Sequence, residues 1–110
     1  YEKDTNIDHQ VCYNSILPAI RPVNNPIRLV LSFEILSSTE WNYCQQFRPN
    51  YFINIKDNIK AKIHACSKYQ GEISEKGIGR SAEMIRALSI LRGSQSGYDF
   101  AEAYKLIVSR

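Results

Sequence analysis

The chain contains a near-continuous apolar run, Ile27-Arg28-Leu29-Val30-Leu31-Ser32-Phe33-Glu34, which predicts a β-strand. Apolar side chains at successive rather than alternate positions are typical of a strand that is covered on both faces. A polar segment, Ser37-Ser38-Thr39-Glu40-Trp41, follows as a loop. We therefore expect an α/β domain whose sheet is mixed or parallel and is flanked by helices.

A helix is predicted upstream of this strand. Its apolar positions are spaced i, i+3, i+4 and i+7, and they are Tyr13, Ile16, Leu17 and Ile20. Asp8 is a suitable N-cap because its carboxylate can accept the unpaired amide hydrogens of the first turn. Pro18 lies near the end of the helix and Pro22 beyond it, where proline ends or kinks a helix.

The downstream half of the sequence also contains predicted strands and helices. Residues 51–55 form a short predicted strand, and Asp57 is expected to cap the helix that follows. Ser81 is expected to cap a third helix, with Gly93 near its C-terminal end. The predicted core stripe of this helix is Met84, Ile85, Leu88 and Leu91. Residues 98–108 fit either a strand or a helix, and their apolar end favours a strand, so the predicted order is helix, strand, strand, helix, helix, strand.

Charge and hydropathy argue against two classes of partner. The net charge is +3, from 14 basic and 11 acidic residues that are scattered along the sequence. A mixed distribution predicts a solvated surface and no nucleic-acid partner. A mean hydropathy of -0.35, without an apolar run of membrane-spanning length, predicts no membrane segment.

The three cysteines, Cys12, Cys44 and Cys66, are odd in number and show no C-x-x-C spacing. A small secreted domain that depends on disulfides would have an even number. We therefore predict reduced, buried thiols in a cytoplasmic protein.

One histidine has local features that are compatible with metal binding. His9 lies at the start of the first predicted helix, where the positive end of the helix dipole favours neutral imidazole, the form that binds metals. An ordinary surface histidine is the alternative. His64 adjoins the apolar face of the second helix and is interpreted as a packed or flanking side chain.

Several segments, in order and over nearly the whole chain, resemble the C-terminal half of the PIG-L/LmbE family of zinc-dependent N-deacetylases. They are Asn6-Ile7-Asp8-His9, Phe33-Glu34-Ile35-Leu36-Ser37-Ser38-Thr39-Glu40-Trp41, Phe47-Arg48-Pro49-Asn50-Tyr51-Phe52, Arg80-Ser81, Ala87-Leu88, Leu91-Arg92-Gly93, Tyr98 and Ala101-Glu102-Ala103-Tyr104.

The resemblance implies that residues 1–110 are the C-terminal part of a single Rossmann-like (LmbE-like) domain that deacetylates an N-acetylated amino sugar or sugar conjugate. It implies that His9 is a zinc ligand and that Asp8 orients a nearby imidazole. The family's A-H-P-D-D-E motif, which supplies two zinc ligands and the general base, is absent from this sequence. The zinc site would thus be completed by the N-terminal half of the domain, and residues 1–110 alone would be inactive. Asn6 occupies the position of a second histidine in one branch of the family, so the residue that stabilises the oxyanion is not assigned.

The resemblance also suggests residues that contact the substrate. Glu40 and Trp41 follow a strand end, where α/β sheets bind ligands, and are expected to line the sugar cleft. Trp41 could equally anchor the core. Arg80 is expected to reach a phosphate or sugar hydroxyl, with a purely structural role as the alternative.

Two other functions remain open from the sequence. One is a non-catalytic sugar- or nucleotide-binding domain of the same fold, and the other is an interaction module that packs against a partner chain. The sequence does not identify the sugar, and it leaves homo-oligomer formation open.

Overall fold

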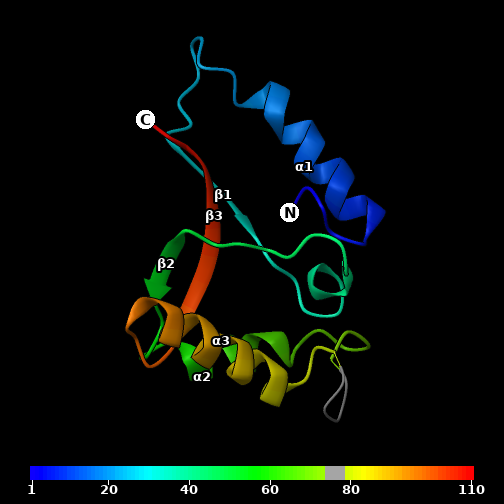
Figure 1. Ribbon diagram of the computed structural model, residues 1–110, viewed down its shortest axis with the longest axis vertical. Helices are drawn as coiled ribbons and strands as arrows, with labels where there is room; N and C mark the ends of the chain where they lie inside the picture. Colours follow the sequence, from blue (N-terminus) through cyan, green and yellow to red (C-terminus); the bar gives the residue numbers. More distant parts are fainter. Residues whose placement is uncertain (74–78) are drawn as a thin grey trace. The chain divides into compact units, whose positions relative to one another are not determined.

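The computed structural model describes residues 1–73 and 79–110. Its elements, in chain order, are α1 (Ile7–Ala19), β1 (Leu29–Phe33), the 3₁₀ helix η1 (Thr39–Trp41), β2 (Tyr51–Asn54), α2 (Ile59–Cys66), α3 (Ala82–Ser96) and β3 (Ala101–Ser109) (Figure 1). The predicted order of helices and strands is confirmed, including the final strand. The short helix η1 lies in the segment that the sequence predicted to be a loop.

The three strands form one sheet in the order β1-β3-β2. β1 runs antiparallel to β3, with Leu29 opposite Ser109 and Phe33 opposite Tyr104, and the register shifts between Val30 and Leu31. The α/β content is therefore as predicted, but the expected mixed or parallel sheet is wrong, because this pair and the β2–β3 pair are both antiparallel. A continuous apolar run reports how well a strand is covered and says nothing of its direction. Coverage was also overestimated, because Leu29 and Phe33 are exposed.

β2 pairs with the other side of β3. The Asn50 amide donates to the Tyr104 carbonyl at 2.9 Å, and the Ile55 amide donates to the Phe100 carbonyl at 3.0 Å. The pairing positions rise along one strand while they fall along the other, so this pair is antiparallel as well.

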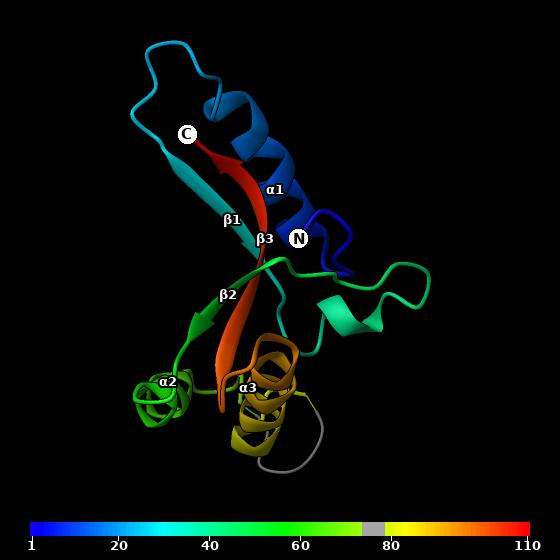
Figure 2. The same ribbon diagram turned by 60° about the vertical axis from the view of Figure 1, so that its left-hand side comes forward.

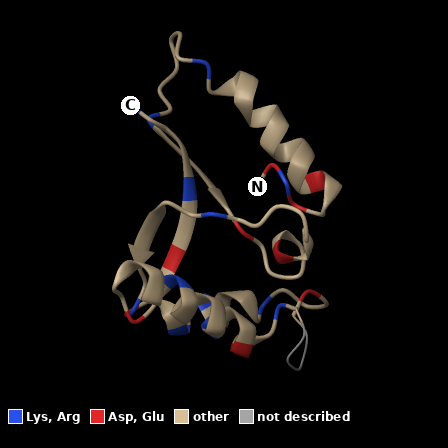
Figure 3. Cartoon of the chain, in the orientation of Figure 1, with Lys and Arg blue, Asp and Glu red and all other residues tan. Residues whose placement is uncertain are grey.

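The chain divides into two compact units. Unit 1 comprises Tyr1–Tyr51 and Tyr104–Arg110, and unit 2 comprises Phe52–Ala103. Figure 3 shows that basic and acidic residues are interspersed along the chain in both, as the sequence predicted. No helix in the described ranges is both long enough and apolar enough to span a membrane.

Unit 2 is built on the packing of α2 against α3. Its buried apolar side chains are Ile55, Ile59, Ile85, Ala101 and Ala103. The Ser81 N-cap is confirmed, since its hydroxyl accepts a 3.2 Å hydrogen bond from the Met84 amide. The predicted Asp57 cap is wrong: Asn58 is the N-cap of α2, and its side chain makes no capping bond.

The buried stripe of α3 differs from the predicted one. Its buried members are Ile85, Ser89, Arg92 and Gly93, whereas Leu91 is 49% exposed. At Gly93 the absence of a side chain allows the backbone of Tyr98 and Asp99 to approach the helix closely, and apolar character alone does not reveal this. The helix ends at its C-cap Gly97, whose φ of 78° is left-handed, and Gly93 lies near this end, as predicted.

Unit 1 has less apolar interior. α1 lies alongside β1 and the C-terminal part of β3 (Figure 2), yet none of its residues is buried. Of the predicted apolar face, Ile20 at the C-cap is buried, and Ile16 and Leu17 are exposed. The N-cap of α1 is Asn6 in place of the predicted Asp8, because the Asn6 side chain accepts from the Asp8 amide at 2.8 Å.

Candidate functional site

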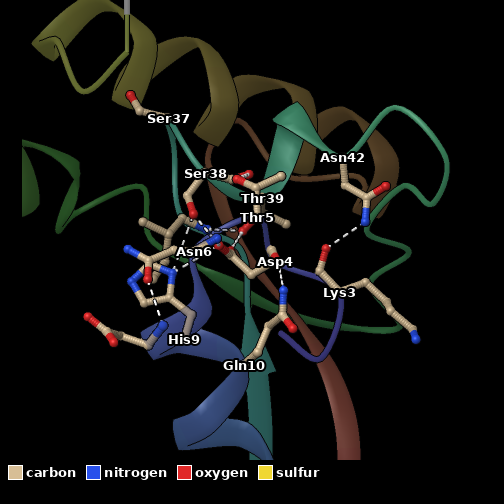
Figure 4. A network of polar contacts seen from close by, with 12 residues as sticks. Lys3, Asp4, Thr5, Asn6, His9, Gln10, Ser37, Ser38, Thr39 and Asn42 are labelled. Carbon is tan, nitrogen blue, oxygen red and sulfur yellow. Dashed lines mark hydrogen bonds and ion pairs between the residues drawn. The ribbon is translucent and has the colours of Figure 1, made fainter.

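A buried carboxylate organises the polar interior of unit 1. Asp4 is only 1% exposed. Its Oδ1 accepts hydrogen bonds from the Asn6 amide at 2.9 Å and from the Ser38 hydroxyl, and its Oδ2 accepts from the Thr39 hydroxyl at 2.5 Å. His9 Nδ1 lies 3.0 Å from the same Oδ1 (Figure 4). The network thus joins the segment before α1, the first turn of α1 and the loop after β1.

The loop after β1 is shaped so that two hydroxyl groups reach Asp4. Glu40 accepts from the backbone amides of Ser37 at 2.5 Å and Ser38 at 3.2 Å, which holds the turn closed. Ser37 has a left-handed φ of 64°. The Thr39 amide donates to the Ile35 carbonyl at 2.9 Å, and the Thr39 hydroxyl accepts from the Ile35 amide at 2.8 Å. Hydrogen bonds within the loop therefore hold the Ser38 backbone and the Thr39 hydroxyl independently of Asp4.

The start of α1 fixes the histidine. The Asn6 cap sets the first turn, and the Gln10 side chain donates to the Asp4 carbonyl at 2.6 Å, which ties that turn to the preceding segment. The His9 side chain is 24% exposed, whereas the Asp4 side chain is fully buried. Because Nδ1 faces Asp4, Nε2 on the opposite side of the ring is the nitrogen that can bind a ligand or accept a proton.

The hydrogen bonds control the ionisation of Asp4. Burial by itself would raise the pKa of the Asp4 carboxyl, but the hydrogen bonds from Ser38, Thr39, the Asn6 amide and His9 outweigh burial and lower the pKa from 3.8 to about 2. The carboxylate is therefore ionised at neutral pH and acts only as an acceptor.

This lowered pKa predicts acid-sensitive stability. The Asp4 pKa is lower in the folded state than in the unfolded chain, so its contribution is present above pH 3.8 and is lost as the pH falls toward about 2. The shift corresponds to about 2 kcal/mol. Urea unfolding followed by the fluorescence of Trp41, the only tryptophan, should show this loss. An Asp4→Asn variant should lack this acid step, and an equal acid loss in both proteins would contradict the assignment.

The structure places the predicted site residues in different surroundings. His9, Glu40 and Trp41 belong to unit 1, whereas Arg80 belongs to unit 2, where it forms an ion pair with Glu72. Glu40 caps the loop amides. Trp41 is 50% exposed, so it does not anchor the core. A role of Glu40, Trp41 or Arg80 in substrate binding stays a prediction.

The carboxylate that contacts His9 was not found from the sequence. Asp8 was predicted to orient an imidazole, but it is exposed, and the carboxylate at the His9 ring is that of Asp4. The hydroxyl partners of Asp4 are 34 and 35 residues away in sequence, so no local spacing indicates the network.

The arrangement does not resemble that of a serine nucleophile. Ser38 is buried, and its hydroxyl donates to Asp4. It also lies 3.4 Å from His9 Nδ1, the nitrogen that already faces the carboxylate. In a Ser-His-Asp triad the serine and the aspartate contact opposite nitrogens of the ring. Ser38 therefore supports Asp4 and is not placed for attack.

Within residues 1–73 and 79–110, no group of three or more His, Cys, Asp or Glu side chains is arranged to hold a metal ion. All three cysteines are free, and Cys12 and Cys44 are exposed in contrast to their predicted burial.

The chain matches no known protein family, no curated protein and no solved structure.

Proposed function

We propose that His9 is one ligand of a zinc ion in a hydrolase that removes the acetyl group of an N-acetylated amino sugar or sugar conjugate. The other ligands and the general base would come from outside residues 1–110, and the chain by itself would be inactive. The domain would be the C-terminal half of a Rossmann-like, LmbE-like fold. The observation that carries the proposal is the contact between Asp4 and His9 Nδ1.

The donor set fits one position of such a zinc site. Histidines that bind zinc usually donate their second ring N–H to a carboxylate or a carbonyl, which fixes the ring and raises the basicity of the ligating nitrogen. Asp4 provides this carboxylate, and partial exposure of His9 leaves its ring accessible. Zinc would lower the pKa of its bound water and would act as a Lewis acid that polarises the amide carbonyl.

Exposed apolar residues are compatible with a missing half-domain. Ile7 and Val11 on α1 and Leu29 and Phe33 on β1 are large apolar side chains in contact with solvent. Such a surface fits the role of residues 1–110 as one part of a larger domain, and it fits an interaction module equally well. The free cysteines support a reducing compartment, for which we propose the cytoplasm.

Zinc content and amine release, measured on the native polypeptide that contains residues 1–110, test the proposal. A His9→Ala variant should lower the zinc affinity by at least about tenfold and lower amine release with it, because one ligand is lost. His64→Ala is the matched control, since His64 is exposed on α2 in unit 2.

Two results would overturn the assignment. A native protein that binds no zinc excludes the deacetylase and favours a binding domain or an interaction module. Equal zinc affinity in the parent and in His9→Ala excludes His9 as a ligand even if the protein is a metalloenzyme.

A further inference from the structure

We propose that Asp4 is a positioning residue that fixes the tautomer of His9, with the proton on Nδ1 and the lone pair on Nε2, and that Ser38 and Thr39 hold Asp4 in place for this task. The inference rests on the proposed role of His9 as a metal ligand. It adds that Nε2 is the nitrogen of His9 that binds the metal, and that Asp4, Ser38 and Thr39 hold the ring in the orientation that leaves Nε2 free to bind.

The geometry leaves one tautomer compatible with the network. An ionised carboxylate only accepts hydrogen bonds, so the 3.0 Å contact between Asp4 Oδ1 and His9 Nδ1 requires a proton on Nδ1. The other neutral tautomer would place a bare nitrogen lone pair against a carboxylate oxygen. The Ser38 hydroxyl, 3.4 Å from Nδ1, cannot relieve that repulsion while it donates to Asp4.

The carboxylate cannot easily turn away from the histidine. The Asn6 amide and the Ser38 hydroxyl hold Oδ1, and the Thr39 hydroxyl holds Oδ2 at 2.5 Å. The side chain is fully buried, so water is not available as a substitute partner. Donors from the adjacent Asn6 and from the distant loop after β1 thus set the position of Asp4, and Asp4 in turn sets the His9 ring.

This arrangement has a consequence for ligand binding. A neutral histidine in the wrong tautomer carries a proton on the nitrogen that would bind the metal. A carboxylate that removes this tautomer makes every neutral His9 competent at Nε2, which is the role of outer-shell partners in metal sites. Substitutions in the loop after β1 are therefore expected to change the affinity for the metal indirectly, through Asp4, although the loop residues do not contact the metal.

Two-bond ¹H–¹⁵N correlation spectra of the histidine-labelled, metal-free native protein test the inference, at a pH where the imidazole is neutral. The expected result is that His9 carries its proton on Nδ1. Asp4→Ala should abolish that preference and weaken zinc binding about tenfold to hundredfold. Asp4→Asn should retain the preference at least in part, because its amide oxygen can still accept from Nδ1.

Asp8→Ala is the matched control and separates the two candidate carboxylates. It should leave the tautomer unchanged if Asp4 is the positioning residue. A His9 proton on Nε2 in the parent protein, or a shift in Asp8→Ala without one in Asp4→Ala, would overturn the inference. The parent spectrum decides the point even if Asp4→Ala does not fold.

The spectrum is recorded without metal, so it is independent of the proposed function. If His9 carries its proton on Nδ1 and the protein binds no zinc, the deacetylase proposal fails and the positioning role of Asp4 stands. If zinc binds and the proton is on Nε2, the positioning role alone fails.

Discussion

Replacing Asp4 by alanine is expected to lower the free energy of unfolding by about 4 kcal/mol. The substitution removes an acceptor that serves the Asn6 amide, the Ser38 and Thr39 hydroxyls and His9. At least two of these donors lie in buried residues, and each buried donor left without a partner costs about 1–3 kcal/mol. The effect is large for this chain because the interior of unit 1 depends on this polar network, with Phe47 and Ile20 as its buried large apolar side chains.

Urea unfolding monitored by Trp41 fluorescence is the appropriate measurement, because Trp41 lies in unit 1. Asp8→Ala is the comparison. It removes a carboxylate of the first turn of α1 that is exposed and favoured only by the helix dipole, so a loss below about 1 kcal/mol is expected. If Asp4→Ala were as mild as Asp8→Ala, the network would not be a main source of stability in unit 1.

Gly93→Ala is expected to destabilise unit 2 by about 3 kcal/mol. In a helix interior, alanine is normally more favourable than glycine by about 1 kcal/mol. Here, however, a Cβ at Gly93 would lie 2.5 Å from the Tyr98 carbonyl oxygen and 2.9 Å from the carbonyl carbon and oxygen of Asp99. These are backbone atoms, and the hydrogen bond from the Tyr98 amide to the Gly93 carbonyl at 2.9 Å holds that turn against the helix. The clash can be relieved only if α3 and the turn before β3 move apart.

Gly97→Ala is the matched control for this prediction. Gly97 has a φ of 78°, and among the described residues a Cβ added there would meet no atom within 4 Å beyond its chain neighbours, so the cost of the substitution is conformational. That cost is about 1 kcal/mol. Urea unfolding followed by far-UV circular dichroism reports on all helices of the chain, of which α2 and α3 belong to unit 2. A ranking in which Gly97→Ala is the more harmful variant would show that close approach at Gly93 is unimportant.

The sequence predicted several local features of the fold correctly, although the predicted Asp8 and Asp57 caps were wrong. Periodicity and turn residues gave the order of helices and strands, the Ser81 cap and the final strand, because these depend on neighbours within a few positions. His9 was also singled out locally, from its place at a helix start. Its role as a metal ligand stays a prediction.

Tertiary structure determined the features that depend on distant partners. The antiparallel pairing of β1 with β3 joins residues that are far apart in the sequence, and an apolar run is the same for either direction. The solvent exposure of α1 likewise depends on what covers it and not on its own pattern. In the sequence, Asp4 is one of several polar residues that precede the first predicted helix. It became the centre of the candidate site only when folding brought to it hydroxyl groups that lie 34 and 35 residues away, since hydrogen bonds of such range leave no periodic signal in a sequence.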